Sequence, residues 1–300
     1  MSLAKVPDAC IEVELAKLIT LGKSVRFRRI VALLANALMQ LAPSLSPNVE
    51  IMLMLTLPEN FPGYVSDLNR DVLRELAALT GLNINLTESA VFTVGAAGGG
   101  LALAASIEKL KNIKMNTCVI MAGADSCIDL SLLAQLDKAR RLANLDALDS
   151  FVPGEGACAL LLSAEANPSS LGAVSCLENG IEDGHRFASD TAYRGDGLAR
   201  TMSRSLTLYA GANKPAIIYS NLNGESFGVK ELGVATIRNS QHLANPWRQE
   251  HPADGYGDQG GASFPLLIAI ALANKAAPAL VLCSSWGAER CCVLVEAPRA

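Results

Sequence analysis

The stretch NVEIMLMLTLPENF (48–61) recurs in altered form as KPAIIYSNLNGESF (214–227), at an offset of about 166 residues. Each copy is an apolar run typical of a buried strand, followed by a turn and then by Glu and Phe at the same spacing. A helical pattern precedes each run, over 24–41 in the first copy and over 197–210 in the second. Because apolar strings can match by chance, the repeat needs support from other parts of the chain.

Three further matches follow in the same order along the chain. They pair GAAGGGLALAASIEKL (95–110) with GDQGGASFPLLIAIAL (257–272), TCVIMAGAD (117–125) with ALVLCSSWGAE (279–289), and GEGACALLLSAE (154–165) with GAERCCVLVEAP (287–298). Four matches in one order at nearly constant spacing indicate two copies of a single α/β unit. Each copy contains, in this order, a strand, a helix, a strand that breaks at a Gly-rich turn, a buried helix and two further strands. This order predicts a mixed sheet covered by helices.

The repeat also predicts how the chain is divided. We expect an N-terminal half over 1–196 and a C-terminal half over 197–300, which together form one compact unit. The first half carries an insertion at about 126–153 between its last two strands. The polar, Gly-rich segment 167–196 is expected to be the linker between the halves.

The apolar content of the chain predicts a large core and no membrane span. Half of the 300 residues are hydrophobic, and the Gly- and Ala-rich helices expected at 98–110 and 260–272 suit a buried place between two sheets. The longest uncharged apolar runs, 30–42 and 262–274, have about 13 residues, fewer than the roughly 20 of a membrane-spanning helix. The first residues, 1–19, interleave charged and apolar side chains and lack the core of a signal peptide.

Charge and cysteine usage exclude several classes of function. The net charge is only −4, and we find no basic cluster longer than Arg26, Arg28 and Arg29, so a nucleic-acid partner is not expected. The eight cysteines contain no C-x-x-C pair and have no histidine at ligand spacing. We therefore expect reduced core cysteines, no metal site and a cytoplasmic protein.

One segment resembles a known family. GADSCIDLSLLAQLDKARRLANLDALDSFVPGEGACALLLSAE (123–165) resembles the β-ketoacyl synthase segment that ends in a DGFVxGEGAGxLVLE motif. The matching residues are Asp149, Phe151, Val152, Gly154, Glu155, Gly156 and Ala157. With the duplication, most of 48–298 resembles the thiolase-like superfamily and, within it, the β-ketoacyl-[acyl carrier protein] synthases. The resemblance implies a five-layer αβαβα fold with mixed sheets, built from two duplicated halves.

The resemblance also implies a degenerate active site. The family's nucleophilic cysteine lies at the start of a buried helix in a motif like TACSSSLxAL, where the helix dipole and backbone N–H groups assist it. The equivalent here is TVGAAGGGLAL, which puts Ala97 at the cysteine position. A methyl group cannot attack a thioester.

Both family histidines are also replaced. The HGTGT-like motif becomes NLNGES and offers Asn223, and the GHxxxAAG-like motif becomes GYGDQGGAS and offers Asp258. The family's lysine would align near Ala253. If these alignments hold, Asn223 and Asp258 face a shared cavity beside the helix start at 98–100, either as a structural hydrogen-bonding pair or as groups that hold a ligand.

Six further residues are candidates for this pocket: Gly98, Gly99, Cys127, Glu155, His251 and Ser284. Cys127 could be a displaced nucleophile, with a packing cysteine as the alternative. His251 lies seven residues before Asp258 and could reach the pocket. The run 98–100 lacks both the Lys-Ser/Thr ending of a P-loop and the G-x-G-x-x-G spacing of a dinucleotide site, so no cofactor is expected. His185, in a Gly-rich loop with two aspartates, is interpreted as part of a solvated linker.

These observations favour a β-ketoacyl synthase-like protein of fatty-acid or polyketide-type acyl metabolism that does not condense. It would bind an acyl chain, or an acyl carrier protein or acyl-CoA, or serve as a partner subunit. The alternative is an acyltransferase or thioester hydrolase that uses the same cavity, with Asp258 as its base. The family dimerises through the strand before the nucleophile turn, here 88–94, which implies a homodimer or a ketosynthase-like partner.

Overall fold

Two mixed β-sheets and the helices around them make up the part of the chain that the computed structural model describes, residues 24–144, 147–165, 170–275 and 278–296. Residues 1–19, in which we expected no signal peptide, lie outside the described part.

The first sheet has the strand order β2-β1-β3-β4. Its strands are β1 (Glu50–Thr56), β2 (Ala90–Phe92), β3 (Thr117–Ser126) and β4 (Glu155–Leu162). The strand β1 runs parallel to β2 and β3, whereas β4 is antiparallel to β3. The apolar run of β1 is continuous rather than alternating because both faces of the strand are covered.

The second sheet repeats this order as β7-β6-β8-β9 and adds β5 beside β9. Its strands are β5 (Ala173–Ile181), β6 (Ile217–Ser220), β7 (Arg248–Glu250), β8 (Ala279–Ser284) and β9 (Glu289–Glu296). Again the first strand of the copy, β6, is parallel to its two neighbours, and the last, β9, is antiparallel to β8. The repeated stretches of sequence thus occupy the same place in two sheets of the same topology.

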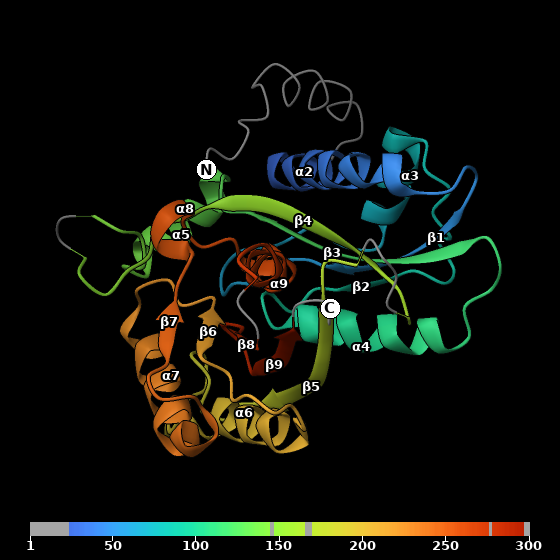
Figure 1. Cartoon of the computed structure of the whole chain (residues 1–300). Helices are drawn as coiled ribbons and strands as arrows, with labels where there is room; N and C mark the ends of the chain where they lie inside the picture. The colour runs from blue at the N-terminus through green and yellow to red at the C-terminus, as the bar shows by residue number, and fades with distance from the viewer. Residues whose placement is uncertain (1–23, 145–146, 166–169, 276–277, 297–300) are drawn as a thin grey trace.

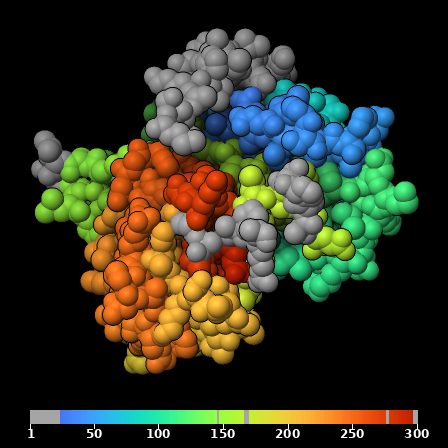
Figure 2. Space-filling model, in the orientation of Figure 1, coloured from blue at the N-terminus to red at the C-terminus, as the bar shows by residue number. Residues whose placement is uncertain are grey.

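Helices complete five layers, αβαβα, as the resemblance implied (Figure 1). The outer face of the first sheet carries α2 (Val25–Leu41) and α3 (Asp71–Thr80), and that of the second carries α6 (Asp196–Leu208) and α7 (Ser226–Asn239). These two outer layers lie at opposite sides of the molecule, blue and yellow to orange in Figure 2. Between the sheets lie α4 (Gly98–Lys111) and α9 (Ser263–Ala273), which share one apolar core with both of them.

Glycine lets the central helices approach their neighbours closely. A Cβ added at Gly99 would lie 2.4 Å from Cβ of Phe264, and one added at Gly100 would lie 2.4 Å from Cβ of Cys291. The Gly-rich run at the start of α4 is therefore explained by packing against α9 and β9.

The segment 167–196, expected to be a linker, contains β5. This strand pairs with β9 at the edge of the second sheet, with an irregularity between Ser175 and Glu178. Because an edge strand with a bulge and polar residues lacks a clean two-residue period, the pattern did not reveal it. The division of the chain at residue 196 stays a prediction.

The remaining elements are short. The region of the predicted insertion, 126–153, contains α5 (Leu130–Lys138), and α8 (Ala253–Tyr256) precedes the central helix α9. The 3-10 helices are η2 (Ala42–Ser44), η3 (Ser240–His242) and η4 (Gly260–Ala262). Among the described residues no helix has the length and apolar character needed to cross a membrane.

Candidate functional site

The start of α4 holds Ala97, the position at which the resemblance places a nucleophile. The turn before it uses Gly95 at φ +73°, and Ala97 is only 1% exposed. The N–H of Ala97 donates to Oγ of Ser285 at 3.0 Å. The next three N–H groups, of residues 98–100, donate to the carbonyls of residues 95–97. The backbone N–H groups of residues 97–100 therefore already have acceptors and are not free to stabilise an oxyanion.

A partly buried carboxyl group, that of Glu59, lies next to this turn. Oε1 of Glu59 accepts a hydrogen bond from the backbone N–H of Trp286, and Oε2 accepts one from Gly287, each at 2.7 Å. A side chain at Gly95 would collide with the carboxyl group of Glu59. Burial raises the pKa of Glu59 to about 7, although the two N–H groups favour its charged form. Glu59 thus binds the turn between β8 and β9 and lies against Gly95 in the turn before α4.

Asn223 and Asp258 lie within hydrogen-bonding distance of each other. Nδ2 of Asn223 donates to Oδ2 of Asp258 at 2.7 Å, and the N–H of Gly260 donates to Oδ1 at 2.9 Å. Burial raises the pKa of Asp258 despite these two hydrogen bonds, and nearby carboxylates raise it further. The structure therefore brings together the two residues that the sequence placed at the histidine positions.

Two small cavities flank this pair. The larger has a volume of about 60 Å³ and the smaller about 20 Å³. Both are bordered by Asn221, Asp258, Ser284 and Trp286, and Ala97 borders neither. Sites for drug-sized ligands usually measure roughly 300 Å³ or more. The cavities can hold a few waters or a very small molecule, and they give no access to Ala97.

Sequence reasoning missed Asn221, the first residue after β6. Its side chain makes two hydrogen bonds with the backbone of Ser284, one to the N–H and one to the C=O, each at 2.9 Å. Unlike Asn223, it borders the smaller cavity, which also touches Gly95 and Ala96 at the helix start. Its position within NLNGES, directly after a strand, was the signal that could have revealed it.

The other sequence candidates have different surroundings. Cys127 lies in an apolar cluster with Phe61 and Phe151, and burial raises the pKa of its thiol well above the usual range. Nδ1 of His251 lies 2.9 Å from Oγ of Ser220, a residue that borders the larger cavity, and burial lowers the pKa of His251. Neither of them borders the two cavities, whereas Ser284 borders both.

Glu155 also lies away from the two cavities. Burial alone would raise the pKa of Glu155, but hydrogen bonds from Arg29 and Ser126 outweigh it and lower the pKa. The carboxylate therefore links α2 to the first sheet, in the same way as the buried Arg26–Asp125 ion pair.

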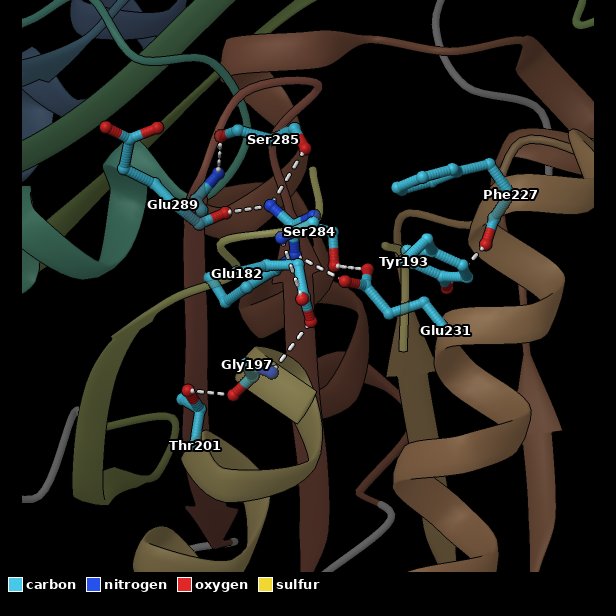
Figure 3. A network of polar contacts seen from close by, with 12 residues as sticks. Glu182, Tyr193, Gly197, Thr201, Phe227, Glu231, Ser284, Ser285 and Glu289 are labelled. Carbon is cyan, nitrogen blue, oxygen red and sulfur yellow. Dashed lines mark hydrogen bonds and ion pairs between the residues drawn. The ribbon is translucent and has the colours of Figure 1, made fainter. Parts of the chain in front are cut away.

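Two buried arginine–carboxylate pairs surround the larger cavity. Arg141 donates two hydrogen bonds to Glu225, at 2.8 and 2.7 Å, and lies 4.3 Å over the ring of Trp286. Nε of Arg290 donates to Glu231 at 2.7 Å, and Oγ of Ser284 donates to the same carboxylate at 2.6 Å (Figure 3). These pairs hold the chain after β6 and β8 in place.

The described part of the chain contains no group of three or more His, Cys, Asp or Glu side chains arranged to hold a metal ion. His185 accepts a hydrogen bond from the N–H of Phe187 at 3.3 Å and lies against the ring of Phe187. The cysteines among the described residues are free thiols.

No family model matches the sequence, and no curated protein matches it. Solved structures do match the fold. The complex described as "AntDE:AntF (apo): type II PKS acyl-carrier protein in complex with its ketosynthase bound to the hexaketide" is matched with a TM-score of 0.69 and 14% identity, over 93% of this chain and 87% of that chain. The ishigamide ketosynthase/chain length factor is matched with a TM-score of 0.58 and 16% identity, over 85% and 74%.

A shorter match involves a modular enzyme. The ketosynthase from module 6 of the bacillaene synthase from Bacillus subtilis 168 is matched with a TM-score of 0.63 and 12% identity, over 84% of this chain. The chain spans only about half of that ketosynthase, 54% of its length. With its paired sheets and central helices, the protein has the thiolase-like fold of the ketosynthases.

Proposed function

We propose that this protein is a non-condensing ketosynthase-like partner subunit of fatty-acid or polyketide-type acyl metabolism, working in the cytoplasm. The observation that carries the proposal is the start of α4, where a buried methyl group stands at the nucleophile position and its N–H is bound to Ser285. Decarboxylative condensation needs a thiolate for the acyl chain and groups that stabilise the enolate. Asn223 and Asp258 do not supply an imidazole.

A partner role is favoured over acyl-chain binding by the size of the cavities. At about 60 and 20 Å³ they are too small for a fatty-acyl chain, and neither is bordered by Ala97. Two structural neighbours are described as a ketosynthase/chain length factor and as a ketosynthase in complex with an acyl-carrier protein. A ketosynthase-like subunit and an acyl carrier protein are therefore the candidate partners.

The first test concerns chemistry at Ala97. Incubation with a panel of acyl thioesters should leave no adduct on residues 95–100, as read by intact mass and peptide mapping. The Ala97→Cys variant should still not condense, because catalytic groups that act as a unit fail together. Its buried thiol should be alkylated much more slowly than that of Ala134→Cys, a control on the exposed surface of α5. Condensation by the wild-type protein would refute the proposal.

The second test concerns assembly. The strand β2 lies at the edge of the first sheet, where its outer backbone groups can pair with another chain. The protein should sediment as a dimer at micromolar concentration, and Thr93→Lys, a charge at the exposed end of this edge, should shift it toward monomer. Thr207→Lys on the exposed side of α6 is the control. A wild-type monomer would count against dimerisation through β2.

The alternative, an acyltransferase or thioester hydrolase, has one observation in its favour. Asp258 borders both cavities and burial raises its pKa, and perturbed pKa values are common among catalytic carboxyl groups. Turnover of a thioester that is lost in Asp258→Asn would favour this alternative over the partner role.

A further inference from the structure

The larger cavity has its apolar floor on the outer side of the second sheet, although Ser285, which binds the N–H of Ala97, also borders it. Its apolar floor belongs to the core cluster between this sheet and α6 and α7, whereas Ala97 belongs to the central cluster between the sheets. The floor consists of Leu198, Leu222, Leu232 and Leu282. At its edge are Ser220 and Ser284, the last residues of β6 and β8. In α/β sheets the carboxyl ends of parallel strands are common places for ligands.

The carboxyl groups around the cavity already have partners within the protein. Glu225 and Glu231 each have a buried arginine of their own, Arg141 and Arg290. Asp258 accepts hydrogen bonds from Asn223 and Gly260, and burial raises its pKa, which favours the neutral form. These three groups thus leave little negative charge to balance a further cation.

Arg186 is that further cation. Its side chain borders the cavity, is 20% exposed, and lies with the guanidinium 5.0 Å over the ring of Phe227. Arg186 forms an ion pair with Glu225 at 3.2 Å. Arg141 already binds the same carboxylate through two hydrogen bonds. Burial, and then repulsion by Arg141, lowers the pKa of Arg186. The surface carboxylate of Asp149 also attracts Arg186, but it accepts hydrogen bonds from the N–H and Oγ of Ser226.

We propose that this cavity binds a short monocarboxylate of two or three carbons. Its carboxylate would pair with Arg186, and its alkyl group would lie on the leucine floor beside Phe227, which Figure 3 labels. At about 60 Å³ the cavity has room for about four to six waters at roughly 10–15 Å³ each, which suits acetate or propionate but not a longer acid. The proposal does not depend on Ala97, so it goes beyond the partner role and can fail independently of it.

The experiment measures binding of acetate, propionate and hexanoate to the whole protein by amide chemical shifts in NMR titrations. Propionate should shift signals from residues 220–228 and 284–286 and bind at least ten-fold more tightly than hexanoate. Propionamide, which has the same shape without the charge, should bind at least ten-fold more weakly, as expected when a charged hydrogen bond is lost. This comparison needs no variant and so does not depend on the folding of a mutant.

Substitution then tests whether Arg186 supplies the positive charge that binds the carboxylate. Arg186→Met should weaken propionate binding at least ten-fold, whereas Arg204→Met, on the exposed side of α6, should leave it unchanged. Absence of propionate binding, equal binding of propionamide, or undiminished binding to Arg186→Met would overturn the proposal. Tighter binding of inorganic phosphate than of propionate would overturn the assignment to carboxylates.

Discussion

Arg290→Met should destabilise the protein by about 3–5 kcal/mol, because it leaves the carboxylate of Glu231 buried without its cation. The ion pair is fully enclosed, with side-chain exposures of 0% and 1%. After the substitution Glu231 would keep only the hydrogen bond from Ser284. The total stability of a domain is about 5–15 kcal/mol, so the loss is a large fraction of it. Urea denaturation followed by circular dichroism measures the change.

The position of Arg290 makes this loss important for the site. Nη1 of Arg290 donates to the carbonyls of residues 285 and 287, in the turn between β8 and β9, and of residue 289, the first of β9. In the same turn, Oγ of Ser285 accepts a hydrogen bond from the N–H of Ala97, and two backbone N–H groups donate hydrogen bonds to Glu59. The helix α7, through Glu231, is thereby tied to the start of α4.

Two controls separate the buried pair from ordinary surface effects. Arg238→Met breaks an exposed pair with Asp196 and should cost no more than about 1 kcal/mol. Replacing both members of the buried pair, Glu231→Leu with Arg290→Met, should cost less than Arg290→Met alone, because no charge is left unpaired. If Arg290→Met were as stable as Arg238→Met, the assigned role of the buried pair would be wrong.

The layered fold could be predicted because its signals are local. The apolar runs of β1 and β6, and the Gly- and Ala-rich helices α4 and α9, are each visible in one short window, and their repetition indicates the topology. The strand β5 was missed because its pairing with β9 joins distant segments and its own pattern is broken.

The site could be predicted only in part. Ala97, Asn223 and Asp258 were found by their positions in motifs, and a hydrogen bond between Asn223 and Asp258 was one of the two alternatives, but the other partners of these residues were not predicted. Glu59 is hydrogen-bonded to Trp286, 227 positions away in the sequence, and Arg141 to Glu225, 84 positions away. Such contacts are made by the tertiary fold and leave no periodic trace in the sequence. Glu59 and Glu225 were seen as markers of the repeat, yet one binds backbone N–H groups and the other binds arginines.

Glu59→Gln should remove a pH dependence of stability between about pH 4.5 and 7. Burial raises the pKa of Glu59 from 4.5 to about 7, so the folded protein holds a proton that the unfolded chain releases. The stabilisation that comes from the protonated form is complete below about pH 4.5 and is lost as the pH rises through about 7. A pKa shift of this size corresponds to a change of roughly 3 kcal/mol in the free energy of unfolding. We expect about 2 kcal/mol, because Glu59 borders the smaller cavity and is only partly buried.

The measurement compares urea denaturation of the wild-type and Glu59→Gln proteins at pH 5 and pH 8. From pH 5 to pH 8 the unfolding free energy of the wild-type protein should fall by about 2 kcal/mol relative to that of Glu59→Gln, because glutamine bears no charge at either pH. Glu88→Gln is the control, because Glu88 is exposed and its pKa is lowered by a hydrogen bond from Lys109. A pH-independent difference for Glu59→Gln would mean that the carboxyl group titrates alike in the folded and unfolded chains. In that case the hydrogen bonds from Trp286 and Gly287 would offset the effect of burial on the pKa of Glu59.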